Sequence, residues 1–182
     1  MVLLSPQLVR REAAVGLSGV LPGLGATSVM TFFMLLGHHL GARSVQEPVP
    51  PKRITERVAR RVGLRRHIDQ DRLTALSIMA HFGYGSFFAV VYRMTVGRLT
   101  RQPAVGALFG LALWAAGYLG YLPRLGLYPS AGDRPKGRVA VVAGSHLVWG
   151  AALALFSRMP TGRPGFPSLQ GFWVRSTAQG HR

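Results

Sequence analysis

The sequence predicts an all-α membrane protein with four transmembrane helices, and the placement of its charges is the first observation behind this prediction. The chain has 182 residues, of which 22 are Lys or Arg and 6 are Asp or Glu. None of these charged residues lies in four windows of 19 residues or more. A helix needs about 20 apolar residues to cross the hydrocarbon core of a bilayer. We therefore expect four spans, at about residues 14–40, 73–92, 103–123 and 139–157.

An internal repeat is the second observation, and it predicts that the spans form two similar helical hairpins. Residues 81–98, "HFGYGSFFAVVYRMTVGR", align with residues 146–163, "HLVWGAALALFSRMPTGR", at a constant offset of 65. Seven of the 18 aligned positions are identical, including His81 with His146. A weaker match pairs "AVG" at residues 14–16 with "AVG" at residues 104–106. Spans one and two are expected to form one hairpin, and spans three and four the other.

The repeat also predicts where the two histidines lie in the membrane. A two-span unit returns the chain to the side where it began, so both copies have the same orientation, as in a parallel repeat. His81 and His146 lie at similar distances from the start of their spans. At about 1.5 Å per residue, both imidazoles are about 10–12 Å from the same membrane face. We expect them at one level.

The first span has three features of its own. Arg10 and Arg11 precede its apolar run as in a signal peptide, but the run is too long and lacks a small-x-small cleavage site, so we expect it to remain as a span. Pro22 is expected to kink the helix, because proline lacks the backbone donor and clashes with the preceding turn. Glycines spaced as G-x-x-x-G predict close helix packing. These are Gly19 with Gly23, and Gly106 with Gly110 in span three.

Residues 43–72 form a basic loop that contains a predicted amphipathic helix. The loop opens with the Pro-rich stretch "SVQEPVPPK". Ile54, Val58 and Val62 then recur every four residues among arginines, and Gly63 ends the pattern. Such a pattern is typical of a short helix that lies on the membrane surface and binds anionic lipid headgroups. A solvated basic loop is the alternative.

The second span begins after two acidic residues and carries a polar face. Asp69 and Asp71 favour a helix N-terminus. Together with His67 they resemble a metal site, but a capping role is the simpler interpretation, and we expect no metal site. Polar and small residues lie on the same helical face as His81 and favour contact with another helix over contact with lipid. They are Thr74, Ser77, Gly85 and Tyr92.

The distribution of Lys and Arg predicts the orientation of the chain. Loop 43–72 holds nine basic residues and loop 124–138 holds four, against nine in the other segments outside the spans. Cytoplasmic loops carry the excess of basic residues, so we expect these two loops in the cytoplasm. The transmembrane domain covers residues 1–159. Residues 160–182 form a Gly- and Pro-rich tail that we expect to be irregular.

Composition excludes several classes of function. The net charge of +16 would suggest nucleic-acid binding in a soluble protein, but here the charges occupy only the segments outside the spans. The chain has no cysteine, so disulfides, Cys metal sites and thiol catalysis are excluded. It has no phosphate loop, nucleophile elbow or HExxH motif. We therefore expect neither an enzyme nor a nucleic-acid partner.

Four phrases of the sequence resemble a known family. They are "PPKRITERVARRVG", "AHFGYG", "ALFGLALWAAGYLGYLPRLGLYP" and "SHLVWGAAL", between Pro50 and Leu155. The chain resembles the YagU-like family of uncharacterised bacterial inner-membrane proteins. The resemblance implies a multi-pass protein of the bacterial inner membrane, in some relatives associated with acid resistance. It carries over no catalytic or ligand-binding residue.

The first functional interpretation is a non-catalytic membrane protein, either a homo-oligomer or a subunit of a larger complex. His81 and His146 then hydrogen-bond between helices. Intramembrane polar contacts of this kind contribute about 0.6–2 kcal/mol each. This interpretation requires no cofactor.

Two alternatives give His81 and His146 a function. As axial ligands from two helices they could bind haem. The predicted neighbours of the macrocycle are Gly85, Gly150, Tyr84 and Trp149. Because imidazole titrates near neutral pH, the pair could instead sense or relay protons, together with His38 and His39 at the end of span one. No Asp or Glu lies in any span, whereas ion pathways commonly use them.

Overall fold

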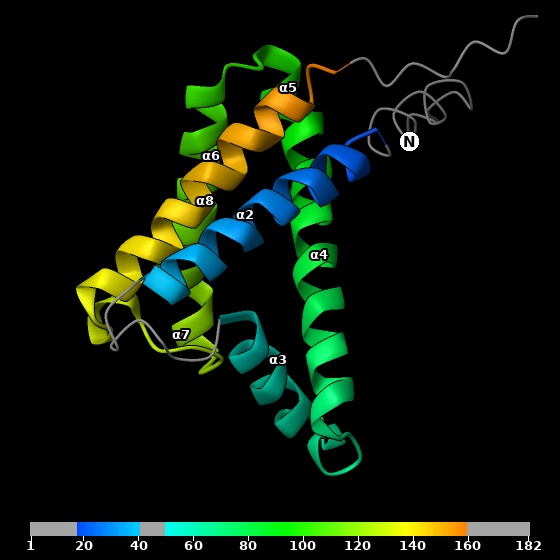
Figure 1. Cartoon of the computed structure of the whole chain (residues 1–182), viewed down its shortest axis with the longest axis vertical. Coiled ribbons are helices and arrows are strands. Elements are labelled where there is room, and N and C mark those ends of the chain that lie inside the picture. The colour runs from blue at the N-terminus through cyan, green and yellow to red at the C-terminus, as the bar shows by residue number, and fades with distance from the viewer. Residues whose placement is uncertain (1–17, 41–49, 160–182) are drawn as a thin grey trace, which may run out of the picture.

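A computed structural model describes residues 18–40 and 50–159, and it confirms the all-α membrane fold. Within these ranges every regular element is a helix. Four helical stretches are long and apolar enough to cross a membrane (Figure 1). They are α2 (Val20–Leu40), α4 (Gln70–Met94), the stretch Pro103–Arg124 and α8 (Lys136–Phe156). The third stretch comprises α6 (Pro103–Ala115), the π-helical segment η3 (Ala116–Tyr121) and α7 (Leu122–Arg124).

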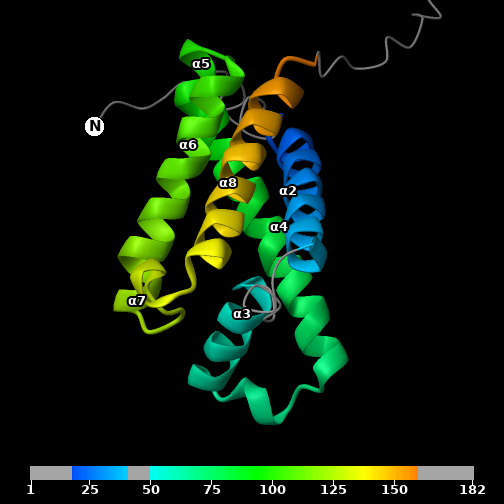
Figure 2. The same ribbon diagram turned by 60° about the vertical axis from the view of Figure 1, so that its left-hand side comes forward.

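The shorter helices lie at the two ends of this bundle. α3 (Pro50–Arg61) and η2 (Leu64–Arg66) precede α4, and η4 (Ala131–Asp133) precedes α8. α5 (Val96–Leu99) connects α4 to α6. Figures 1 and 2 show α3 and α7 at one end of the bundle and α5 at the other. The start of α2 and the end of α8 lie at the α5 end.

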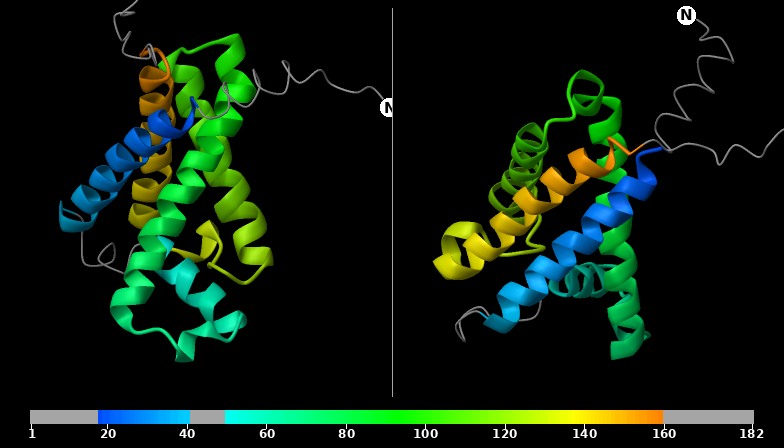
Figure 3. Two further views of the ribbon diagram at one scale, coloured as in Figure 1. Left: turned by 90° about the vertical axis from the view of Figure 1, so that its right-hand side faces the viewer. Right: turned by 45° about the horizontal axis from the view of Figure 1, so that its top comes forward.

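Helices α2 and α8 hold the bundle together. α2 packs against both α4 and α8, and α8 packs against α6 (Figure 3). The buried apolar core follows these contacts, with residues from α2, α4 and α8. It consists of Ala26, Met30, Met34, Ala89, Tyr92, Trp149, Leu153 and Ala154. The first and the last described helices therefore share one core.

The observed helix boundaries correct one expectation. α2 begins at Val20 after a turn at residues 18 and 19, and residues 14–17 lie outside the described part of the chain. Pro22 therefore lies in the first turn of α2, where backbone N–H groups have no partner within the helix. The predicted kink at Pro22 is wrong for this reason. Two other helices start earlier than expected, since α4 and α8 each begin three residues before the predicted spans. Asp69 caps α4, as predicted, by accepting a 2.8 Å hydrogen bond from the Arg72 N–H.

Glycines allow two pairs of helices to approach closely, as the G-x-x-x-G spacing predicted. A Cβ atom at Gly23 would lie 2.7 Å from the Cβ of Ala89, where α2 crosses α4. One at Gly106 would lie 2.7 Å from the Cβ of Ala154, where α6 crosses α8. Gly110 also faces the α8 backbone. Gly19, the other glycine of the predicted pair in span one, is buried in the turn before α2.

The predicted amphipathic helix is α3. It ends near Gly63, which adopts a left-handed backbone conformation with φ of 76° that favours glycine. α3 packs against α4 and buries Ala59. The predicted apolar stripe is divided, because Ile54 lines a cavity whereas Val58 and Val62 are exposed. Arg57 connects α3 to the chain before α8 through a 3.2 Å hydrogen bond to the Gly126 carbonyl.

Acid is expected to loosen α3. Arg60 hydrogen-bonds Glu56 at 2.7 Å, with Arg65 3.5 Å away, and these bonds lower the pKa of Glu56 below its ordinary value. A carboxyl with a lowered pKa stabilises the fold above its unfolded pKa, and this contribution is lost as the pH falls through the lowered value. Backbone hydrogen exchange of residues 50–61, corrected for its intrinsic pH dependence, should increase below about pH 4. In the Glu56→Gln variant, exchange of these residues should already be fast at pH 7. If acid still increased exchange in this variant as much as in the unsubstituted protein, Glu56 would not have this role.

Candidate functional site

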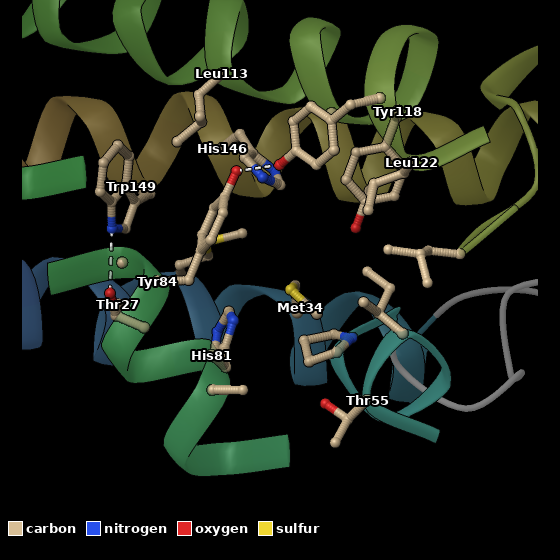
Figure 4. Close-up of a pocket in the computed structure, with 18 residues that line it drawn as sticks. Thr27, Met34, Thr55, His81, Tyr84, Leu113, Tyr118, Leu122, His146 and Trp149 are labelled. Carbon is tan, nitrogen blue, oxygen red and sulfur yellow. Dashed lines mark hydrogen bonds between the residues drawn. The ribbon is translucent and has the colours of Figure 1, made fainter. Parts of the chain in front are cut away.

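One cavity of the described structure lies among all four spans and α3. Its volume is about 270 Å³. α2, α4 and α8 form its sides, and the stretch from α6 to α7 faces α4 across it (Figure 4). Pro51, Ile54 and Thr55 of α3 lie at one end of it. The cavity is thus built from segments that are far apart in the sequence.

Both predicted site residues line this cavity. His81 points into it from α4 and His146 from α8, on opposite walls (Figure 4). His146 is buried, with 8% of its surface exposed. Its Nδ1 lies 2.8 Å from the Val142 carbonyl, so Nδ1 carries the hydrogen and donates it. In the neutral ring, Nε2 is then the hydrogen-bond acceptor.

His81 belongs to a hydrogen-bonded set on α2. The Thr31 hydroxyl donates to the Thr27 carbonyl at 2.7 Å, so its oxygen accepts from Nε2–H of His81 at 3.2 Å. The Thr27 hydroxyl oxygen accepts a 3.2 Å hydrogen bond from Nε1–H of Trp149. One turn of α2 therefore connects α4 with α8. The sequence pattern did not identify Thr27 or Thr31, because nothing local shows which face of α2 meets the other helices.

Two tyrosines connect α4 to the third span, two walls of the cavity that have little backbone contact with each other. The hydroxyl groups of Tyr84 on α4 and Tyr121 on η3 hydrogen-bond to each other (Figure 4). Both side chains are partly exposed, at 40% and 37%. Closer to the α5 end, the rings of Tyr92 and Phe109 lie 5.2 Å apart. Side chains, and not close backbone packing, thus connect α4 to the third span.

The π-helical segment η3 shapes the wall opposite α4. A π-helix widens the turn, and such segments often occur at functional sites. Gly117, Tyr118 and Tyr121 line the cavity from η3, and Leu122 lines it from the start of α7. The ring of Tyr118 meets the ring of His146 edge to face, with centroids 5.9 Å apart. The sequence pattern did not indicate η3, although two glycines lie within "AGYLGY".

The chemistry of the lining favours an uncharged ligand. No Lys, Arg, Asp or Glu lines the cavity. Its polar groups are imidazoles, phenols, two threonine hydroxyls and the indole N–H of Trp149, set in a mostly apolar wall. A charged group would pay a large desolvation cost here without an opposite charge. In the described ranges, no cluster of three His, Asp or Glu side chains could hold a metal ion.

The other residues considered for haem binding have structural contacts. Gly85 lies against Thr27 of α2, and Gly150 lies against the backbone of Gly106. Both glycines therefore serve helix packing, which removes one reason for expecting a macrocycle beside them. His38 and His39 lie in the last turn of α2 with ring centroids 5.8 Å apart, and neither lines the cavity.

Comparison with known proteins identifies the family. A family model described as "Protein of unknown function (DUF1440)" matches residues 36–155, more than half of the chain. The chain belongs to the DUF1440 family. The YagU-like family that the sequence resembles is known under this designation. The DUF1440 match includes α3, α4, η3 and α8 of the cavity wall, whereas Thr27 and Thr31 precede it. No curated protein and no solved structure matches the chain.

Proposed function

We propose that this DUF1440 protein is a non-catalytic membrane protein that binds an uncharged, largely apolar molecule in its intramembrane cavity. The observation that carries the proposal is a mostly apolar cavity of about 270 Å³ into which His81 and His146 point. This volume lies just below the range of about 300–1,000 Å³ that is usual for ligand pockets. It suits a ring or a head group, with the remaining chain extending into the bilayer.

The hydrogen-bonding state of His146 favours a ligand with a hydroxyl group. Because Nδ1–H is used by the Val142 carbonyl, the remaining nitrogen accepts and does not donate. A hydroxyl hydrogen of the ligand satisfies it. The mostly apolar wall then covers the apolar part of the ligand. An alcohol with a long hydrocarbon or isoprenoid chain has both properties.

A ligand of this kind would enter from the bilayer between α4 and η3. The Tyr84 and Tyr121 side chains are partly exposed on this side, and their hydroxyl groups meet across it. At the other end of the cavity, Pro51, Ile54 and Thr55 of α3 are half-buried and restrict access from water. By this route the apolar part of the ligand moves from the bilayer into a mostly apolar cavity without passing through water.

Filling the cavity should abolish binding. The probe is a long-chain fatty alcohol with a photoreactive diazirine and an alkyne, added to the full-length protein in lipid nanodiscs. Leu113→Trp places a large side chain at a lining position and should lower specific labelling about tenfold, which corresponds to about 1.4 kcal/mol. Excess 1-decanol should compete in the unsubstituted protein.

Leu108→Trp is the matched control, because Leu108 lies on the same helix but is 64% exposed. It should label like the unsubstituted protein. Equal labelling of the Leu113→Trp and Leu108→Trp variants, with cross-links spread over exposed helix faces, would show that the probe reports only lipid contact.

Proton-linked function is the second candidate, favoured by the two imidazoles on one cavity. It predicts proton flux in proteoliposomes that is lost when His81 and His146 are both replaced by Ala. Haem binding by the same pair predicts Soret absorbance in protein purified after expression with added haem. A role in an envelope response to acid belongs with the proton-linked candidate.

We also propose a location for the protein and a surface that meets lipid. The resemblance to the YagU-like family supports the bacterial inner membrane, and the count of basic residues supports the α3 end as the cytoplasmic end. The basic side chains of α3 would then bind anionic headgroups there. Assembly into a homo-oligomer or a larger complex is compatible with this arrangement.

Equivalent contacts support a repeated hairpin. Ala89 and Ala154, which the offset of 65 pairs, meet Gly23 and Gly106 respectively. These contacts make Gly23 of the first hairpin equivalent to Gly106 of the second. The weaker "AVG" alignment instead pairs Gly16 with Gly106, so the two alignments differ in register. We infer that the two hairpins descend from one unit.

A further inference from the structure

Three arginines at the α5 end of the bundle form one connected set. Arg93 lies in the last turn of α4, Arg101 precedes α6 and Arg158 follows α8. Arg93 Nη1 donates a 3.0 Å hydrogen bond to the Ser157 carbonyl. Arg158 Nε donates a 2.9 Å hydrogen bond to the Arg101 carbonyl. The side chains of Arg93 and Arg158 and the backbone of Arg101 are thus joined where the ends of both hairpins meet.

No carboxylate of the described residues lies at this end. The acidic residues in these ranges belong to α3, to the start of α4 and to η4, at the opposite end of the bundle. They are Glu56, Asp69, Asp71 and Asp133. Arg93 and Arg101 lie close enough for their like charges to interact. The carbonyl groups that accept from Arg93 and Arg158 are neutral, so they satisfy donors without balancing the charge.

The arginines also keep donors for a further partner. A guanidinium has five N–H donors, and the two carbonyl contacts account for one each on Arg93 and Arg158. Arg101 and Arg158 are exposed and Arg93 is half-buried. Phosphate oxygens match the paired donors of arginine in geometry as well as charge.

Two neighbouring polar groups add to this set. Ser157, which accepts from Arg93 through its carbonyl, is 2% exposed, and its hydroxyl oxygen is buried without a hydrogen-bond partner in the described structure. α6 begins at Pro103, two residues after Arg101, and its N-cap residue Gln102 makes no side-chain capping bond. The first N–H groups of α6 therefore add partial positive charge beside Arg101.

We infer that Arg93, Arg101 and Arg158 form a binding site for a phosphate group. The site lies at the ends of α4 and α8, where spanning helices reach the membrane surface. The phosphate is supplied by the headgroup of an anionic phospholipid or by free phosphate in solution. This site is separate from the cavity, and it is at the opposite end from the basic residues of α3.

Ligand-dependent thermal stability of the full-length protein in detergent tests the inference. The probes are dioleoylphosphatidylglycerol, dioleoylglycerol as its analogue without phosphate, and inorganic phosphate. Phosphatidylglycerol should raise the unfolding temperature, and dioleoylglycerol should not. A response to inorganic phosphate at millimolar concentration would identify free phosphate as the source, and a response to the lipid alone would identify the headgroup.

Substitutions locate the response. Arg101→Gln removes an exposed side chain that is not needed for the carbonyl contact, and it should weaken the apparent affinity about fivefold, as expected for one basic residue near a lipid surface. The variant with all three arginines changed to Gln should lose most of the response, and what remains reports the basic side chains of α3. The matched control replaces three exposed basic residues outside both α3 and this site, Arg66, Arg124 and Lys136, by Gln and should retain the response.

The triple variant could fail for structural reasons, so the corresponding triple Lys variant is measured beside it. It keeps the charge and should respond more weakly than the unsubstituted protein but more strongly than the Gln variant. The inference is overturned if dioleoylglycerol stabilises as much as phosphatidylglycerol. It is also overturned if the Arg101→Gln variant retains full affinity while the control variant of Arg66, Arg124 and Lys136 loses it.

Discussion

Replacing Gly150 by alanine is expected to destabilise the protein, although alanine is the better helix former. A Cβ atom at residue 150 would overlap the carbonyl group of Gly106 and lie 3.0 Å from the Gly110 nitrogen. Both are backbone atoms of α6 and cannot turn away as a side chain can, so α6 and α8 must separate. Overpacking of this kind costs about 1–3 kcal/mol, which exceeds the gain of about 1 kcal/mol from helix propensity. Thermal unfolding in detergent, followed by size-exclusion chromatography, measures the effect.

Gly83→Ala is the matched control for Gly150→Ala. Gly83 lies within α4, and a Cβ atom there would have no neighbour within 4 Å. This variant should unfold at the same temperature as the unsubstituted protein or at a higher one, because only helix propensity changes. If both variants were equally stable, the close contact between α6 and α8 would not exist.

Replacing Trp149 by alanine should have the largest effect of any single substitution. Trp149 is 2% exposed, and its ring stacks near Phe109 with centroids 6.3 Å apart. Removal of a buried Trp costs about 3–5 kcal/mol through lost contacts and the space left behind. Trp149→Phe keeps most of the ring but loses the hydrogen bond to Thr27, and it should cost about 1 kcal/mol.

Trp114→Ala provides the comparison for the Trp149 variants. Trp114 is only half-buried, and its ring stacks on Tyr118 of η3. Its removal should lower the unfolding temperature much less than Trp149→Ala does. Equal losses from the two substitutions would mean that Trp149 does not join α2 to α8 in the membrane.

The spans were predictable because lipid imposes a strict rule on charge. A charged side chain is costly in hydrocarbon, so the uncharged windows already mark the helices α2, α4 and α8 and the stretch Pro103–Arg124. The ends were less predictable, since they depend on local capping. Asp69 accepts from the Arg72 N–H and thereby begins α4 before the apolar window starts. Pro22 was misread because the start of α2 was not evident from hydropathy.

The cavity was predictable only in part. The repeat drew attention to His81 and His146, and both line the cavity. Thr27 and Tyr121 carried no signal, since their roles depend on the rotation of α2 and on the wider turns of η3. Such features arise when helices pack, because packing decides which hydrogen-bonding groups meet.

The position of α2 constrains how the protein is made. α2 is the first of the described helices to leave the ribosome, and its partner α8 is the last. The hydrogen bond between Thr27 and Trp149 joins residues 122 positions apart. During synthesis the face of α2 that packs against α8 therefore remains in the bilayer without this partner. Neither the cavity nor the shared core can form until the fourth span has been inserted.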